Sequence, residues 1–301
     1  MPNGEKPTTN EHFIPQMYLR GFSEIKKRDK SLIWQFNLKT MQQTPVQVDI
    51  QDICSEKHLY EIKGSDGSII AQNTIEKTFG KIETNVSRVI RSIQTKAKNE
   101  NCLNCSTILS EDDKSYLIIF ITSLLYRTPE TIEAGISSLK KTNPEMDNRS
   151  ARNFTLFNLL PLGIDTEWDK NTIIRIAIER LSGMVFQIGI TDNDVVITSD
   201  RPVIIWPPKE DEPYNRPQAV AFPLTSKLLL YLFPVESVDP IARNCFIKLT
   251  PNNINDLYSN LSVCARNWIY SRNALTEDQL KIIAEARNGQ GKLNQQQIIF
   301  Y

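Results

Sequence analysis

Residues 184–198, MVFQIGITDNDVVIT, mark the point where the chain changes from helical to strand patterning. The apolar runs 184–190 and 195–198 carry β-branched and aromatic residues that favour strands, and the polar residues 191–194 between them predict a hairpin turn. Farther along the chain, strands are expected at 203–206, 219–222, 228–233 and 264–271, with helices at 252–260 and 276–287. The second half of the chain therefore favours a mainly antiparallel sheet.

The residues before this stretch have helical patterning. Between residues 74 and 96, apolar side chains recur at steps of three and four and so share one helix stripe: Ile75, Phe79, Ile82, Val86, Val89 and Ile93. Ser110 and Asp113 have the spacing of a capping box, which predicts a second helix that runs to about Arg127 and is ended by Thr128-Pro129. Further helices are expected at 130–141, 150–159 and 169–182.

The N-terminal part of the chain predicts two short strands, at 31–38 and 57–62, after a disordered tail over residues 1–11. Helices followed by antiparallel strands are typical of an α+β fold rather than of a doubly wound sheet. We therefore expect residues 12–301 to form a single α+β domain, in which a helical region is followed by a mainly antiparallel sheet.

The composition excludes several classes of protein. Lysine plus arginine and aspartate plus glutamate each total 35, so there is no whole-protein field to attract nucleic acid, and such a site would need a local patch. No apolar run reaches the roughly 18 residues that cross a bilayer, and the N-terminus lacks the apolar core of a signal peptide. The five cysteines are an odd number without framework spacing. We expect a cytoplasmic protein with reduced thiols and no membrane association.

The sequence also argues against a structural zinc site and against the common nucleotide folds. Cys102 and Cys105 form a single Cys-x-x-Cys pair with no second pair and no nearby histidine. Neither a Gly-x-x-x-x-Gly-Lys-[Ser/Thr] string nor a Gly-x-Gly-x-x-Gly string is present. No residue is therefore assigned as a metal ligand.

The segment from His12 to Phe22 combines several polar groups with an apolar face. His12 is one of only two histidines in the chain and is a candidate catalytic base or acid, because histidine titrates near neutral pH. Gln16 and Arg20 follow at four-residue steps and would share a helical face with it, so both are candidate substrate-binding residues. The alternative is a structural histidine that bonds a nearby carbonyl.

The helix expected over residues 74–96 carries Glu76 and Glu83 at the border of its apolar stripe. They either lie on an ordinary solvated face or pair with Arg20 or Arg127, because buried carboxylates without partners are costly. Arg127, at the end of an apolar helix, either interacts with the last carbonyls of that helix or binds a phosphate or carboxylate in a cleft. Glu76 and Arg127 are candidate catalytic residues.

The run from Val195 to Val203 leads an apolar strand directly into Thr-Ser-Asp and then into a proline. Ser199 and Asp200 can close a local turn by accepting hydrogen bonds from the following amides, or they can serve a site at the end of the strand. We take Asp200 as a candidate catalytic residue and Ser199 as a candidate substrate-binding residue. Ser199 does not lie in a Gly-x-Ser-x-Gly elbow, which argues against a hydrolase-type nucleophile.

Several of these motifs, in this order, resemble those of a microbial family, the domain of unknown function 4238. The resemblance spans most of the chain and rests on His-x-x-Pro-Gln-x-Tyr-Leu-Arg-x-Phe at 12–22, Cys-Ser-Glu-Lys-His-Leu-Tyr at 54–60, Ile75-Glu76 and Glu83, Arg127-Thr128-Pro129, Thr-Ser-Asp-Arg-Pro at 198–202, Phe-Pro-Leu-Thr at 222–225, and Asn252-Asn253. The family carries no established reaction, so the resemblance implies architecture and site positions only.

Four kinds of polar group come from separated motifs: His12, Glu76 or Glu83, Arg127 and Asp200. A packed core would not need this mixture, so we expect the groups to converge in one pocket. There they would cleave a phosphodiester as base, orienting acid and phosphate clamp, and the carboxylates would also accept a divalent metal.

The leading hypothesis is therefore a nuclease-like hydrolase that acts on RNA or DNA as a toxin or phage-defence effector. The alternative is a non-enzymatic binding or interaction module in which the same residues form a structural hydrogen-bond network. The sequence identifies no protein partner.

Overall fold

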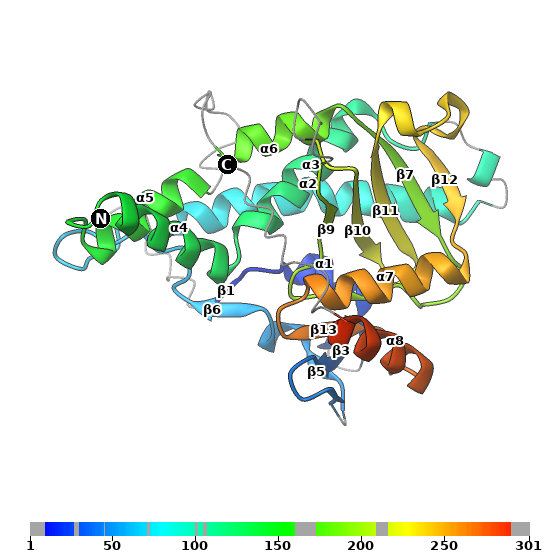
Figure 1. Cartoon of the computed structure of the whole chain (residues 1–301), viewed down its shortest axis with the longest axis horizontal. Helices are drawn as coiled ribbons and strands as arrows, with labels where there is room; N and C mark the ends of the chain where they lie inside the picture. The colour runs from blue at the N-terminus through cyan, green and yellow to red at the C-terminus, as the bar shows by residue number, and fades with distance from the viewer. Residues whose placement is uncertain are drawn as a thin grey trace.

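The computed structural model describes residues 10–26, 30–44, 46–70, 73–99, 102–104, 107–159, 173–208 and 216–289 (Figure 1). Within these ranges, short strands open the chain, helices fill its middle, and a second group of strands with two closing helices follows. The molecule is an α+β protein, which confirms the fold class expected from the sequence. None of the helices in these ranges combines the length and the apolar character needed to span a membrane.

The helices of the middle region follow the predicted pattern closely. All six residues of the predicted stripe are buried on α2, and Ser110 and Asp113 form the predicted capping box of α3, with each side chain bonded to the other residue's backbone amide. The α-helices of the described ranges, including those outside the middle region, are α1 Gln16–Leu19, α2 Thr74–Ala97, α3 Glu111–Tyr126, α4 Pro129–Thr142, α5 Asn148–Leu159, α6 Ile173–Ser182, α7 Pro251–Cys264 and α8 Glu277–Asn288. Residues 169–172, predicted to begin α6, lie outside the described residues.

A five-stranded sheet lies between α3 on one face and α7 on the other, with the strand order β12-β7-β11-β10-β9. Its strands are β7 Met184–Ile190, β9 Ile204–Trp206, β10 Ala219–Thr225, β11 Leu228–Pro234 and β12 Cys245–Lys248. All neighbours are antiparallel except β12 and β7, which are parallel. Because side chains alternate across a strand, Phe222 packs its ring on Tyr18 and on Phe120 of α3, whereas Ala219 and Ala221 face the opposite side.

A second, six-stranded sheet joins the beginning of the chain to its end. It contains β2 Glu24–Lys26, β3 Lys30–Asn37, β4 Gln42–Gln43, β5 Val48–Asp49, β8 Thr198–Ser199 and β13 Trp268–Ser271. β13 pairs with β3 on one side and with β8 on the other, and a separate pair is formed by β1 Asn10–His12 and β6 Ser55–Lys57. Residues of the N-terminal motifs, the residues around Asp200 and the residues around Trp268 thereby come together.

The predicted hairpin at 184–198 is wrong. β7 pairs instead with β11, from Met184 opposite Pro234 to Ile190 opposite Leu228. The seven-residue strand β11 therefore takes the place beside β7 that was predicted for the shorter run 195–198. Residues 191–197 carry the chain out of the five-stranded sheet, and β8 then pairs with β13 in the other sheet.

Smaller corrections concern the N-terminal half and β12. The strand predicted at 57–62 is displaced, because β6 ends at Lys57 and Tyr60 lies in a loop. The last two residues of the predicted disordered tail, Asn10 and Glu11, belong to β1, and residues 1–9 lie outside the described residues. The four-residue strand β12 is not predicted by the sequence pattern.

Candidate functional site

Arg127, directly after α3, is the centre of a buried polar cluster. Its side chain is 1% exposed, its Nη1 donates to Glu83 Oε1 at 3.0 Å, and its Nη2 donates to the backbone carbonyl of His12. The guanidinium carbon also lies 4.0 Å from the ring centre of Phe79. The hydroxyl of Tyr60 donates to the Arg127 carbonyl at 2.8 Å. Arg127 thus ties β1, α2 and the loop at residue 60 to the end of α3.

Two carboxyl groups with raised pKa values belong to the same polar network: Glu76 lies within reach of the Arg127 charge, and Glu11 is linked to it through Tyr60. Glu11 is 1% exposed and accepts a 2.7 Å hydrogen bond from the Tyr60 amide, and burial is the main cause that raises its pKa to about 7. Burial also raises the pKa of Glu76, and the Arg127 charge opposes that rise. Glu76 Oε2 accepts no hydrogen bond from the residues that the structure describes. We call Glu11, His12, Tyr60, Glu76, Phe79, Glu83 and Arg127 the Arg127 cluster.

His12 contributes its backbone to this cluster and turns its imidazole toward neighbouring groups. Its Nε2 lies 3.3 Å from the Gln51 carbonyl oxygen and 3.4 Å from Gln16 Nε2, and burial is the main cause that lowers its pKa. The expected common helical face is wrong, since His12 ends β1 and α1 begins only at Gln16. Arg20 is exposed at the end of α1, and its side chain bonds to none of the described residues.

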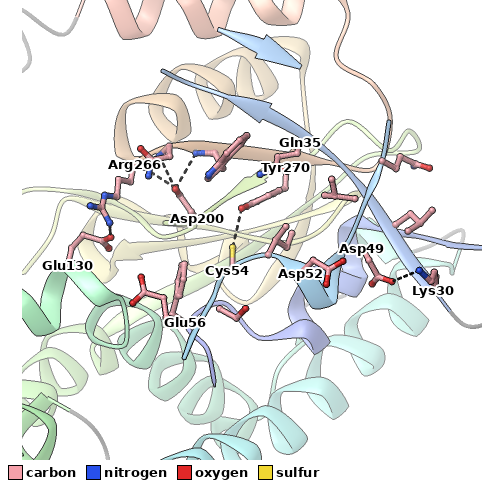
Figure 2. A pocket seen from close by; sticks show the side chains of 18 residues that line it. Lys30, Gln35, Asp49, Asp52, Cys54, Glu56, Glu130, Asp200, Arg266 and Tyr270 are labelled. Carbon is pink, nitrogen blue, oxygen red and sulfur yellow. Dashed lines mark hydrogen bonds and ion pairs between the residues drawn. The ribbon is translucent and has the colours of Figure 1, made fainter. Parts of the chain in front are cut away.

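Asp200 lies in a different cluster and has a local structural role. Its carboxylate accepts hydrogen bonds from the backbone amides of Arg266, Asn267 and Trp268 at 2.9, 2.8 and 3.2 Å (Figure 2). Burial raises the pKa of Asp200, and these three amides oppose the rise. Ser199 is fully buried, and its Oγ accepts a 3.1 Å hydrogen bond from the amide of Arg201.

The expected convergence of all four groups needs correction. The structure brings the His12 backbone, Glu76 and Arg127 together, but within the described ranges no contact joins Asp200 to His12 or Arg127. The physical reason is that Arg127 and Asp200 each already have close polar partners, on different elements: Arg127 binds Glu83 and the His12 carbonyl, whereas Asp200 binds the amides of residues 266–268. Both side chains therefore already have hydrogen-bond partners within the protein.

The open space lies beside Asp200. A cleft of about 860 Å³ is lined by strands of the six-stranded sheet, by the segment 47–56, which includes β5, and by the start of α4 (Figure 2). Its lining comes from several motifs of the sequence analysis and consists of Phe13, Lys30, Leu32, Gln35, Gln47, Val48, Asp49, Asp52, Ile53, Cys54, Ser55, Glu56, Glu130, Asp200, Arg266, Asn267, Trp268 and Tyr270. We call it the acidic cleft, because it holds five carboxyl groups and two cationic side chains.

Several polar groups of the acidic cleft are paired with one another. Glu130, in the first turn of α4, forms ion pairs with Arg266 and with Arg201, and Lys30 lies 3.9 Å from Asp49. Figure 2 shows the Cys54 thiol directed at the Tyr270 hydroxyl, to which it donates at 3.2 Å.

Burial raises the pKa of the Cys54 thiol, so this sulfur stays protonated and is no nucleophile at neutral pH. No group of three or more His, Cys, Asp or Glu side chains in the described part of the chain is placed to hold a metal ion.

The motifs quoted for the family resemblance contact one another in space. Tyr18 and Thr198 hydroxyls lie 2.7 Å apart, and the Phe13 amide donates to the Cys54 carbonyl at 2.9 Å. A family model described as a protein of unknown function, DUF4238, matches residues 10–274. The chain belongs to this family. No curated protein and no solved structure matches the chain.

Sequence reasoning missed several residues of the two clusters of this DUF4238 protein. Tyr60 ends a quoted motif, and Glu130 directly follows Arg127-Thr128-Pro129. Their closeness to these motifs could have identified both as candidate site residues. Glu11 was assigned to a disordered tail, and Arg266 belongs to no quoted motif. Only the pairing of β13 with β8 places Arg266 beside Asp200.

Proposed function

We propose that this DUF4238 protein is a binding module whose acidic cleft holds a small organic cation, a ligand with an amine or guanidine group. The observation that carries the proposal is the set of acceptors left over in the cleft. Asp52 and Glu56 are exposed and form no ion pair with any described residue, and the buried Oδ1 of Asn267 receives no hydrogen bond there. A ligand rich in N–H donors would pair with the two exposed carboxylates.

Charge and aromatic surface support the same class of ligand. Five carboxyl groups against two cations give the lining a negative formal charge, which attracts cations and repels a bare phosphate. Phe13, Trp268 and Tyr270 also line the cleft, and aromatic faces stabilise organic cations by about 0.5–2 kcal/mol. The buried bonds of Arg127 and Asp200 fit the structural-network alternative, in which these residues hold the walls in place.

Calorimetric titration with agmatine, which carries both an amine and a guanidinium, tests this proposal. Asp52→Asn and Glu56→Gln should each weaken agmatine binding by about tenfold, since a charge-assisted hydrogen bond contributes about 1.5 kcal/mol or more. Glu145→Gln is the matched control, because Glu145 is exposed and lies outside the cleft. Agmatine binding no tighter than succinate, or equal weakening by Glu145→Gln, would contradict the proposal.

Phosphodiester hydrolysis by a cytoplasmic toxin or phage-defence effector is a second proposal. It draws support from the Arg127 cluster, where the charge of the Arg127 guanidinium acts on both the Glu76 carboxyl, whose pKa is raised by burial, and the His12 imidazole. Purified protein should then degrade single-stranded RNA or DNA, and His12→Ala should reduce the rate about 10²–10⁴-fold. A wild-type protein without activity on either nucleic acid, with and without added magnesium, would exclude this function.

A further inference from the structure

A second hollow lies on the opposite side of the five-stranded sheet from α3. Its volume is about 380 Å³, and α7 runs across the strands beside it (Figure 1). The lining residues come from β9, β10, β11, β12 and α7 and from the residue just before β10: Ile204, Trp206, Gln218, Ala219, Ala221, Leu229, Tyr231, Phe233, Ile247, Asn253, Asp256, Leu257 and Asn260. We call it the α7 groove. It shares no residue with the acidic cleft.

The strand register gives the α7 groove a floor of small residues between larger walls. Ala221 on β10 lies directly between Ile204 on β9 and Tyr231 on β11. Ala219, two residues along the same strand, is paired with Trp206 on β9. Because neighbouring strands are about 4.8 Å apart, the two walls stand on backbones roughly 10 Å apart. Ala219 is partly exposed and leaves an open trough between these walls, whereas Ala221 is buried.

One wall of the trough is a continuous aromatic surface. The rings of Tyr231 and Phe233 stack with centroids 5.7 Å apart and planes 20° from parallel. Trp206 stands on the other side of β10, and its side chain is only partly buried. Flat aromatic ligands gain from offset or edge contacts with such rings, beyond the area that they bury.

The edge of the α7 groove is polar and rich in acceptors. Asn253, Asp256 and Asn260 follow at helical steps on α7 and so share one face. Asn253 uses its Oδ1 to cap Thr250, which leaves its Nδ2 as a donor, and Asn260 uses its Nδ2 on the Asp256 carbonyl, which leaves its Oδ1 as an acceptor. The Asp256 carboxylate is exposed and is bonded by no described residue. Burial, and next the negative charge of Asp256, raises the pKa of Tyr231 to about 12, so its hydroxyl stays neutral.

We propose that the α7 groove binds a planar nitrogen heterocycle, with its ring over Ala219 and its N–H groups directed at Asp256 and Asn260. Asn253 Nδ2 supplies the donor for a ring nitrogen of the same ligand. The volume of the groove lies at the lower end of the range for ligand sites, which suits a one-ring or two-ring compound rather than a large cofactor. This inference does not depend on what the acidic cleft binds.

Ligand-observed saturation-transfer NMR and calorimetric titration with adenine test this inference, with purine and benzyl alcohol as comparators. Adenine carries an exocyclic amine that purine lacks, and benzyl alcohol has an aromatic ring without ring nitrogens. We expect adenine to bind best, purine about tenfold more weakly, and benzyl alcohol more weakly still. Failure of adenine to bind, or equal binding of benzyl alcohol, would overturn the inference.

Two variants test whether adenine binds in the α7 groove. Ala219→Leu should fill the trough, because Ala219 is partly exposed in its floor, and Asp256→Ala should remove the main acceptor, so each should weaken adenine binding at least tenfold. Asn255→Ala is the matched control for Asp256→Ala, since Asn255 is exposed on the same helix and does not line the groove. If the melting curve of Ala219→Leu is not cooperative, Asp256→Ala alone decides the test, because Asp256 is exposed and its replacement leaves the sheet unchanged. Adenine binding that Asp256→Ala leaves unchanged would overturn the inference.

Discussion

At the scale of single residues, Arg127 shows how a side chain suited to phosphate can have all its partners inside the fold. Its guanidinium faces Glu83, the His12 carbonyl and the rings of Tyr60 and Phe79. Arginine is favoured in such places because its planar fork bonds several acceptors at once and stacks on aromatic faces. Sequence alone could not separate this role from substrate binding, since both need an arginine at the end of an apolar helix.

Loss of Arg127 is therefore expected to destabilise the protein. Arg127→Met removes the cation that acts on the carboxyl groups of Glu76 and of Glu83, whose side chain is 24% exposed. Removing one partner of a buried ion pair costs about 3–5 kcal/mol. We expect a value near 3 kcal/mol, because water still reaches Glu83. Urea unfolding measures this free energy, with Lys81→Met, an exposed position on α2, as the control. A loss below about 1 kcal/mol would contradict the structural role.

Glu11 predicts how stability changes with pH. Its pKa is raised in the folded protein from 4.5 to about 7, so the folded state binds more protons than the unfolded state between these values. The free energy of unfolding should therefore fall as the pH rises from about 5 to 8, by about 2–3 kcal/mol from this group. Glu11→Gln mimics the protonated form and should flatten that slope in urea titrations at several pH values. An unchanged slope in Glu11→Gln, equal to that of Glu145→Gln, would contradict this assignment.

At the scale of elements, helices were predicted well and strand partners were not. The stripe on α2 and the capping box of α3 depend on residues three and four apart, so they are visible in a short stretch of sequence. The partner of β7 depends on which distant strand matches its length, and the sequence near residue 190 contains no information on β11. The same limit applies to Asp200, whose bonds to residues 266–268 exist only once β8 and β13 pair.

The capping box of α3 predicts a measurable effect on stability. Ser110→Ala removes the hydroxyl that accepts a hydrogen bond from the Asp113 amide, and loss of such a cap costs about 1 kcal/mol. Thermal melting should show a correspondingly lower midpoint. Ser138→Ala, at an exposed position within α4, should leave the midpoint nearly unchanged and controls for the loss of a hydroxyl. Equal effects of the two variants would argue against the cap.

At the scale of the whole molecule, the two sheets are connected in ways that separate domains would not be. The chain leaves the five-stranded sheet after β7, enters the other sheet at β8, and returns at β9. Tyr18, packed on Phe222 of the five-stranded sheet, also bonds Thr198 of β8, and one hydrophobic core includes residues of both sheets. Neither sheet therefore keeps its buried surface without the other.

This arrangement predicts that both sheets unfold together. Tryptophan fluorescence reports on both, since Trp34 and Trp268 belong to the six-stranded sheet and Trp206 to the five-stranded sheet, while far-ultraviolet circular dichroism follows mainly the helices. The two signals should change at the same urea concentration, as they do when unfolding is all-or-none. Tyr18→Phe, which removes the buried hydroxyl bond to Thr198, should shift both curves equally, by about 1 kcal/mol or more. Separate transitions in the wild type would mean that the six-stranded sheet is an independent unit, because its loss would then leave the helical signal intact.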